Sequence, residues 1–148
     1  MAEPWSNDEV ITTTALAAMP WGVMGYVNGS TSDQSGISAV ADITSLSVAF
    51  TAISTRLYKT TVHVVVQQLT STGVVKLFIT DGAGAAAVQR DVTLVANDEA
   101  TLIACAIETG GSGALTRKAR ISTTAGTVTV LGTSTRLSHI TVEDIGAA

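Results

Sequence analysis

The stretch LYKTTVHVVVQQL, residues 57–69, decides the fold. Its side chains alternate between apolar and polar with a period of two. The apolar positions are Tyr58, Val62, Val64 and Val66, and the polar positions are Lys59, Thr61, His63 and Gln67. Successive side chains of a β-strand point to opposite faces of a sheet, so this alternation predicts a strand with one buried face.

Similar segments recur along the chain, separated by turn signals such as Asn28-Gly29, Asp81-Gly82 and Gly110-Gly111-Ser112-Gly113. We expect further strands at residues 22–27, 46–53, 74–80, 88–95, 100–107, 115–123, 127–131 and 137–142. Their number and spacing predict an all-β fold, a jelly-roll-like antiparallel β-sandwich of about eight strands. Spacing does not encode strand order, so an immunoglobulin-like topology stays open.

Composition narrows the class of protein. The chain has 148 residues, a formal net charge of −4, 46% hydrophobic residues and 14% charged residues. This length suits one domain, and the single Cys105 can form neither an intrachain disulfide nor a cysteine-rich zinc site. An acidic chain binds phosphate backbones poorly, and no apolar run approaches the ~20 residues of a membrane helix, so we expect no nucleic-acid and no membrane partner. The mean hydropathy of +0.40 is nevertheless high for a protein whose whole surface is exposed to solvent.

Residues 1–20 differ from the rest and are predicted to form an N-terminal arm outside a sandwich domain at residues 21–148. Ser6 and Glu9 match a capping box and favour a short helix, whereas the threonines at 12–14 oppose one. The side chains expected to anchor the arm to a partner are Trp5, Val10, Ile11 and Leu16. A frayed terminus is the alternative interpretation.

Candidate catalytic residues are few. His63 and His139 are the side chains able to act as bases near neutral pH, and each falls inside a predicted strand. We interpret His63 as a solvent-facing or interface residue and His139 as partly buried. Cys105 shares its parity with Ile103 and Ile107, which predicts a small core residue rather than a nucleophile.

Other motifs are equally weak as chemical signals. Residues 82–87 match G-x-G-x-x-A, but the alternation that follows predicts a strand instead of the helix that holds a dinucleotide. Glu143 and Asp144 are adjacent and should point to opposite faces of a strand, so they cannot form an acid and base pair. In the basic cluster at 117–120, Lys118 and Arg120 should share one face. No histidines or carboxylates show metal-ligand spacing, so we expect no metal, no cofactor and no enzymatic activity.

Several predicted strands carry apolar side chains at both odd and even positions. One face of each strand lies in the core, so we expect a partner to cover the apolar side chains on the other face, which a single sandwich would expose to water. The expected interface residues are Val65, Leu69, Val74, Phe78 and Leu102. We therefore expect a homo-oligomer, most simply a trimer with sandwich faces packed at the symmetry axis.

Five segments carry a resemblance to a known family: PWGVMGYV (20–27), DITSLSVAFTA (42–52), RLYK (56–59), ITDG (79–82) and ITVEDIG (140–146). Together they resemble small virion proteins of tailed phages of actinobacteria, some described as capsid decoration proteins and others as minor tail proteins. The resemblance covers about residues 20–147 and implies a β-sandwich structural protein without catalytic residues. This chain departs from the pattern at Ala147, where proline is usual, and in the residues before Met19.

The resemblance implies a capsid decoration protein on the outer surface of the virion head, with the major capsid protein and further copies of itself as partners. In this interpretation the arm residues attach to the shell. The alternative is a minor tail or fibre protein that contacts the host surface through the loops at 81–87 and 110–113.

Overall fold

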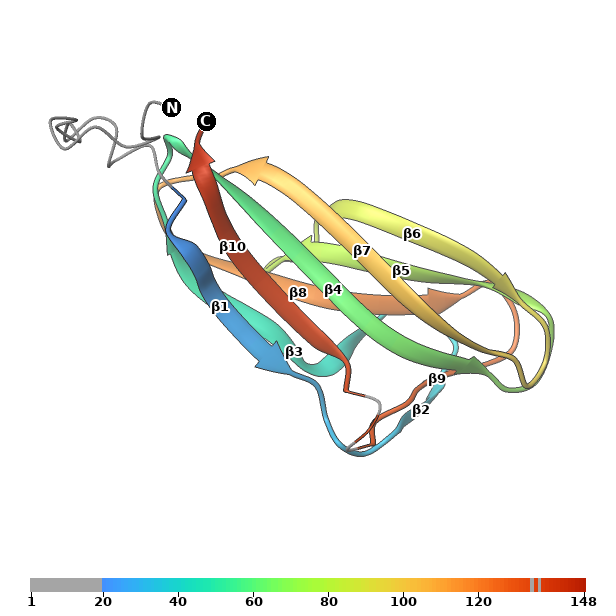
Figure 1. Ribbon diagram of the computed structural model, residues 1–148. Helices are drawn as coiled ribbons and strands as arrows, with labels where there is room; N and C mark the ends of the chain where they lie inside the picture. Colours follow the sequence, from blue (N-terminus) through green and yellow to red (C-terminus); the bar gives the residue numbers. More distant parts are fainter. Residues whose placement is uncertain (1–19, 134, 136) are drawn as a thin grey trace, which may run out of the picture.

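A computed structural model describes residues 20–133, 135 and 137–148. Figure 1 shows an elongated sandwich of two β-sheets, in which β1 begins and β10 ends at the same end of the molecule. The strands of the described residues are β1 (Gly22–Asn28), β2 (Gln34–Ile37), β3 (Ala41–Ala52), β4 (Arg56–Gln68), β5 (Gly73–Asp81), β6 (Ala86–Leu94), β7 (Glu99–Thr109), β8 (Gly113–Thr123), β9 (Val128–Val130) and β10 (His139–Ala147).

The larger sheet has six strands, and β4 lies at its centre. One edge of β4 pairs with β7 along nearly its whole length. The other edge is shared by β10, which pairs with residues 56–63, and by β9, which pairs with residues 66–68. β1 extends the sheet beyond β10, and β2 extends it beyond β9. The strand predicted at 57–69 is therefore confirmed, and its alternation sets the inner and outer faces of this sheet.

The smaller sheet has the strand order β3-β8-β5-β6, and all its neighbours are antiparallel. The core lies between the two sheets. The larger sheet contributes side chains with no exposed surface at Val62, Val64, Val66, Ile140 and Val142, and the smaller sheet contributes Val75, Leu77, Ile79 and Ile121. Each such side chain contributes about 1.5–3 kcal/mol of hydrophobic stabilisation. The all-β prediction is confirmed.

One side of the sandwich closes where β1 approaches β3. A Cβ atom placed on Gly25 would lie 2.4 Å from Cγ1 of Val48, so glycine is needed for this contact between the two sheets. The register of β1 against β10 shifts between Val23 and Gly25. The shift turns Met24 and Val27 toward the core and leaves Val23 and Tyr26 outside.

The strand predicted at 46–53 begins earlier, at Ala41. Its register against β8 shifts between Asp42 and Ser47, and Ser45 adopts a positive φ of 67°. This irregularity lets both Ile43 and Leu46 face the core, which a regular period of two forbids. The alternation is broken at the shift, and this is why the sequence indicates only the second half of β3.

Strand β2 was not predicted, because its residues QSGI carry little hydrophobic signal. Its first residue is held by side-chain hydrogen bonds instead. The amide of Gln34 donates to the carbonyl of Asp42 (3.0 Å) and accepts from the backbone N–H of Thr44 (2.7 Å). The predicted segment 137–142 likewise continues as β10 to Ala147.

The expected orientation of β7 is wrong. Leu102, Ala104 and Ala106 form its inner face, whereas Cys105 is exposed between two exposed isoleucines. The larger isoleucines suggest the buried parity, but the register of β7 against β4 pairs Ala104 and Ala106 with the buried Val62 and Thr60. Leu102, expected at an oligomer interface, is a core residue with 4% exposure.

Candidate functional site

The outer face of the larger sheet is the most distinctive surface of the described residues. Its exposed apolar side chains include Ile107 (62%), Val23 (61%), Ile103 (56%) and Tyr26 (54%). These side chains come from the two outer strands, β1 and β7, and flank the seam between β10 and β4. We call this the large-sheet outer face, consisting of Val23, Tyr26, Lys59, Thr61, His63, Val65, Ile103, Cys105, Ile107, His139, Thr141 and Glu143.

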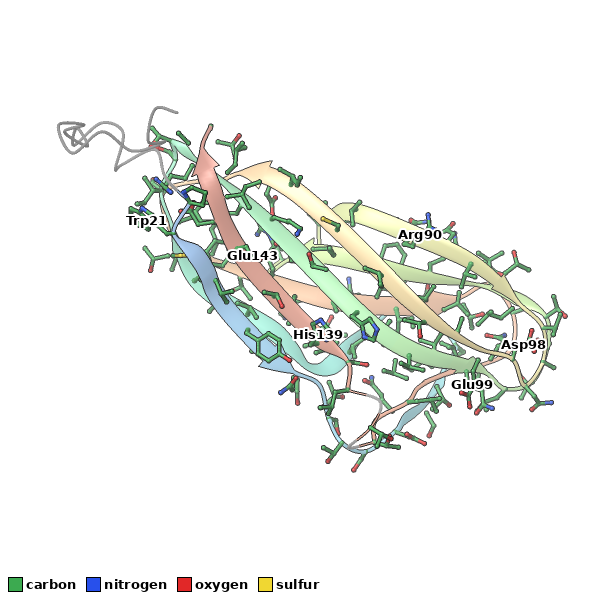
Figure 2. All side chains as sticks on the ribbon, viewed as in Figure 1. Trp21, Arg90, Asp98, Glu99, His139 and Glu143 are labelled. Carbon is green, nitrogen blue, oxygen red and sulfur yellow. The ribbon has the colours of Figure 1, made fainter. Side chains whose placement is uncertain are left out.

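A polar strip runs down the middle of this face, formed by residues paired directly across β10 and β4. Glu143 lies opposite Lys59, and their charged groups are 3.2 Å apart. Thr141 lies opposite Thr61. His139 lies opposite His63, with ring centroids 5.0 Å apart. Figure 2 shows Glu143 and His139 projecting from the same side of β10. The large-sheet outer face therefore carries no net charge from this pair, because the charges of Lys59 and Glu143 cancel within the face.

The structure separates the residues expected at the oligomer interface. Val65 and Leu69 are half-buried on or next to β4 of the larger sheet. Val74 and Phe78 are half-buried on the outer side of β5, in the smaller sheet. The two outer faces point away from each other, and Leu102 lies in the core. One contact surface therefore cannot include all five, and sequence reasoning missed Val23, Tyr26, Ile103 and Ile107.

A buried ion pair holds the end of the sandwich where β1 begins. The Arg56 guanidinium contacts the Asp144 carboxylate with two nitrogens, and the contact from Nη2 to Oδ1 is 2.8 Å. Oδ1 also accepts a hydrogen bond from the backbone N–H of Gly146 (3.0 Å). The hydrogen bond from Arg56 lowers the pKa of Asp144, although burial opposes this shift. Such a paired, multiply bonded carboxylate is ionised and serves as a structural anchor.

Trp21 covers this ion pair. Cζ of Arg56 lies 4.3 Å from the centre of the Trp21 ring, a cation–π geometry, and the backbone of Trp21 contributes to lowering the pKa of Asp144. Figure 2 shows Trp21 at the end of the sandwich where β10 ends. The chain therefore enters β1 from a fixed point. The predicted anchoring residues Trp5, Val10, Ile11 and Leu16, and nearly all of the predicted arm, lie outside the described residues.

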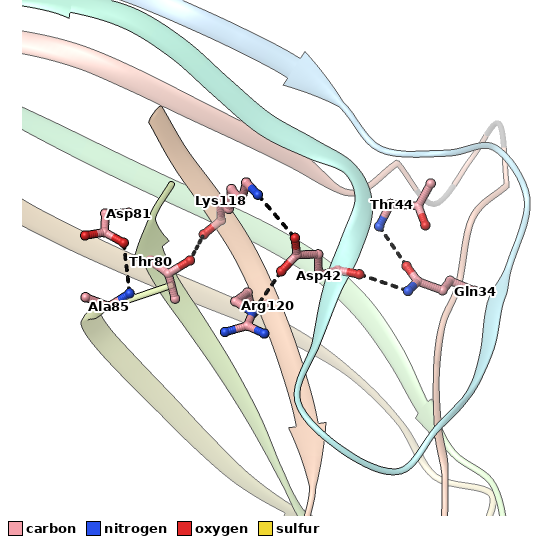
Figure 3. Close-up of polar contacts among 8 residues, drawn as sticks. All are labelled: Gln34, Asp42, Thr44, Thr80, Asp81, Ala85, Lys118 and Arg120. Atoms are coloured by element: carbon pink, nitrogen blue, oxygen red, sulfur yellow. Dashed lines mark hydrogen bonds and ion pairs between the residues drawn. The ribbon is translucent and has the colours of Figure 1, made fainter. Parts of the chain in front are cut away.

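The prediction that Glu143 and Asp144 point to opposite faces is confirmed: Glu143 lies on the large-sheet outer face and Asp144 is buried. The basic cluster is also divided as predicted. Lys118 and Arg120 share the outer side of β8 and both pair with Asp42, at 3.3 and 2.8 Å (Figure 3). Arg117 faces the other way and pairs with Glu108 (2.5 Å).

An open hollow lies between the β5–β6 and β7–β8 loops, and Asp81, Glu108, Leu115 and Arg117 contribute to its lining. The Asp81 carboxylate accepts the backbone N–H of Ala85 at 2.8 Å (Figure 3). This hydrogen bond lowers the pKa of Asp81, with burial opposing and the N–H groups of Gly84 and Ala83 adding to the effect. The amides that a phosphate would need are thus used by Asp81 itself, and strand β6 follows instead of a helix. The G-x-G-x-x-A stretch is a hairpin loop.

Within the described residues, no three His, Cys, Asp or Glu side chains converge as metal ligands. No helix there is long and apolar enough to cross a membrane. Sequence reasoning treated His63 and His139 separately, because only the register of β10 against β4 brings them together. It also missed the pairing of Arg56 with Asp144, which the alternation of β4 and β10 could have indicated, since both residues fall on the inner parity.

Comparisons with known proteins bear on the fold. No family model matches the chain, and no curated protein matches it in sequence. Among solved structures, the chain is similar to the Eiger TNF of S. frugiperda, with a TM-score of 0.54 and 12% identity, covering 86% of this chain and 95% of that one.

Two further similarities are lower. The globular domain of zebrafish complement 1qA gives a TM-score of 0.43 at 12% identity, over 84% of this chain and 95% of that one. The VP2 protein of infectious bursal disease virus gives 0.45 at 9% identity, and the chain spans only 45% of it. The similarity to Eiger TNF concerns the fold alone. With the strand order described above, it identifies this domain as a jelly-roll-like antiparallel β-sandwich, as predicted.

Proposed function

We propose that this protein is a phage virion component that decorates and reinforces the capsid as a homo-oligomer, most simply a trimer. The observation that carries the proposal is the large-sheet outer face, which is apolar at its margins and neutral along its centre. Its two apolar margins, Val23 with Tyr26 and Ile103 with Ile107, border a polar strip, and exposed apolar patches next to polar residues are typical of interaction surfaces. The sequence resemblance to phage decoration proteins supplies the biological setting.

A second copy of the chain fits the large-sheet outer face because the charges on it cancel internally. Lys59 and Glu143 neutralise one another, so like faces meet without net repulsion. Thr61 and Thr141 add hydroxyls that can both donate and accept hydrogen bonds. Burial of Ile103 and Ile107 against a neighbouring copy would remove the largest exposed apolar side chains of β7 from water.

In this proposal the arm attaches each subunit to the major capsid protein. Its apolar side chains Trp5, Val10, Ile11 and Leu16 make the contact, and Trp21 fixes the point where the arm leaves the sandwich. Three arms on one oligomer raise the overall affinity through effective concentration. Contacts that span several capsid subunits exist only in the assembled shell, so they stabilise the shell by linkage.

Light scattering after gel filtration tests the oligomer. At micromolar concentration we expect a trimer, and the double variant Ile103→Lys, Ile107→Lys should be a folded monomer by circular dichroism. The matched control is Val95→Lys, since Val95 is also exposed but lies outside the large-sheet outer face. A monomeric wild-type protein, or an oligomer that survives both lysines, would contradict the proposed interface.

Electron cryomicroscopy of particles that carry labelled protein tests the location. Label spread over the head supports decoration, and label at a single tail vertex refutes it. Removal of residues 1–18 should abolish binding to heads while the oligomer persists. Full occupancy of heads by the truncated protein would show that the arm is not the anchor.

A second candidate function is that of a minor tail or fibre protein, favoured by the hollow between the β5–β6 and β7–β8 loops. Asp81, Glu108 and Arg117 there offer acceptors and donors to a hydroxyl-rich ligand. The Arg117→Ala variant should then lose adhesion to host cells while binding to heads is unaffected. Absence of any wild-type adhesion removes this candidate.

A further inference from the structure

The two histidines of the chain form a cross-strand pair on the large-sheet outer face. His63 and His139 are register partners, and their rings lie 5.0 Å apart between centroids, with an angle of 11° between the planes. The Tyr26 ring stacks on His139 at 5.7 Å and so restricts the directions in which that ring can turn. Two imidazoles are thus held side by side by the sheet itself.

The hydrogen bonding of the pair leaves ring nitrogens available. Nδ1 of His63 is enclosed and has no hydrogen-bond partner. A neutral imidazole has one N–H donor and one nitrogen with a lone pair, so each ring of the pair can offer a lone pair to a ligand.

Metal ions bind neutral imidazole through its unprotonated nitrogen. His63 and His139 are both half-buried on the large-sheet outer face, so part of each residue is open to solvent.

The spacing of the rings agrees with a shared ion. With Zn–N bonds of about 2.0–2.1 Å and tetrahedral angles, two imidazoles on one zinc ion have centroids about 5 Å apart. The centroid distance already has this value, whereas the planes are nearly parallel and must turn about their Cβ–Cγ bonds for the nitrogens to converge. The Cβ–Cγ torsion has broad minima, so turning the His63 ring costs little in torsional energy, whereas the stacked Tyr26 ring limits the turn of His139.

We propose that His63 and His139 together bind a divalent transition-metal ion of the zinc class through one nitrogen of each ring. Imidazole suits zinc, copper and nickel, whereas calcium and magnesium prefer oxygen ligands. With two protein ligands per chain, water completes the coordination, or histidines of a neighbouring copy do so where the large-sheet outer faces meet. The site itself does not depend on the proposed function.

Isothermal titration of the chelator-treated, full-length protein with zinc chloride tests the proposal. We expect saturable binding, with one ion per chain if water completes the shell and fewer if copies share an ion. His63→Gln and His139→Gln each remove a ligand and should weaken binding by more than about tenfold, the smaller loss that removal of an outer-shell partner causes. No binding by the wild-type protein, or unchanged binding by both variants, would overturn the site.

Two controls separate this pair from other donors on the same face. Tyr26→Phe keeps the stacked ring and should bind zinc as the wild type does. Cys105 lies on the neighbouring strand opposite Thr61, so Cys105→Ser asks whether a thiolate contributes. Loss of binding in this variant would overturn the assignment of the ligands. Shifts of both histidine ring signals together in NMR spectra of the wild-type protein give a readout that needs no variant.

Discussion

The inner and outer faces of the larger sheet are built from alternate residues of the same strands, yet they differ sharply in burial. In β7, Leu102 is buried and its neighbour Ile103 is exposed. In β10, Asp144 is buried in an ion pair and its neighbour Glu143 is paired at the surface. The comparison teaches that neither hydrophobicity nor charge determines which face a residue belongs to. What determines the inner face is contact with the smaller sheet.

The largest expected difference between the faces is in the two adjacent carboxylates. Asp144→Ala removes the carboxylate that pairs with the buried Arg56 guanidinium and should lower the free energy of unfolding by about 3–5 kcal/mol. Glu143→Ala is the matched control, and loss of an exposed pair should cost about 1 kcal/mol or less. Urea unfolding at one fixed protein concentration measures both. Similar costs for the two variants would contradict the assignment of faces.

The next expected difference is between Leu102 and Ile103. Leu102→Ala opens a cavity in the core and should cost about 2–5 kcal/mol of unfolding free energy. Ile103→Ala should leave unfolding nearly unchanged in dilute solution, where copies separate, but should weaken self-association. Unfolding curves and light scattering on the same samples distinguish the two roles. If Ile103→Ala proves the more destabilising change in dilute protein, the orientation of β7 is wrong.

Acid should weaken the inner face through Asp144. The pKa of Asp144 is lower in the folded protein than in the unfolded chain, so its contribution is fully present above the unfolded pKa of about 4. It is lost as the pH falls through the lower, folded pKa, because the unfolded state then binds the extra proton. Unfolding measured between pH 6 and about pH 2 should show this loss in the wild type. Asp144→Asn should remove that part of the slope, and an unchanged profile would argue against it.

The smallest expected effect concerns the surface pair Lys59 and Glu143. A double-mutant cycle should give a coupling energy of about 0.2–1 kcal/mol that falls at high salt, since exposed charges are screened. Coupling that persists in about 1 M salt, where the Debye length is about 3 Å, would mean that the pair is shielded from solvent. Such a result would sharpen the proposal that a second copy covers this face.

Much of the fold follows from local patterns. The alternation in residues 57–69 correctly places Val62, Val64 and Val66 inside, and the turn signals correctly separate most strands. The prediction is wrong where the alternation of period two is interrupted, and where the larger of two neighbouring side chains is not the buried one. Ser45 interrupts the alternation in β3. Gln34 forms its strand through side-chain hydrogen bonds, and the alanines of β7 are inside because they pair with inward-facing residues of β4.

The candidate site was less accessible from sequence than the fold. The apolar character of both parities predicts an interface, and this stays a prediction. The residues it indicates include Val74 and Phe78 on the smaller sheet, whereas Val23, Ile103 and Ile107, which are more exposed, lie on the larger sheet. His63 and His139 lie far apart in the chain, and no ligand spacing relates them. Their proximity results from the register of β10 on β4, which local sequence does not specify.

By itself, the sequence determined that this protein is an all-β sandwich, since side-chain alternation and turn residues act over a few neighbours. It also indicated that this chain, with few charged and many apolar residues, has more hydrophobic side chains than one core can bury. Only the tertiary structure decided which residues lie on that surface, that Arg56 meets Asp144, and that two histidines stand side by side. These outcomes depend on strand register and on the packing of two sheets, which are properties of contacts between distant segments.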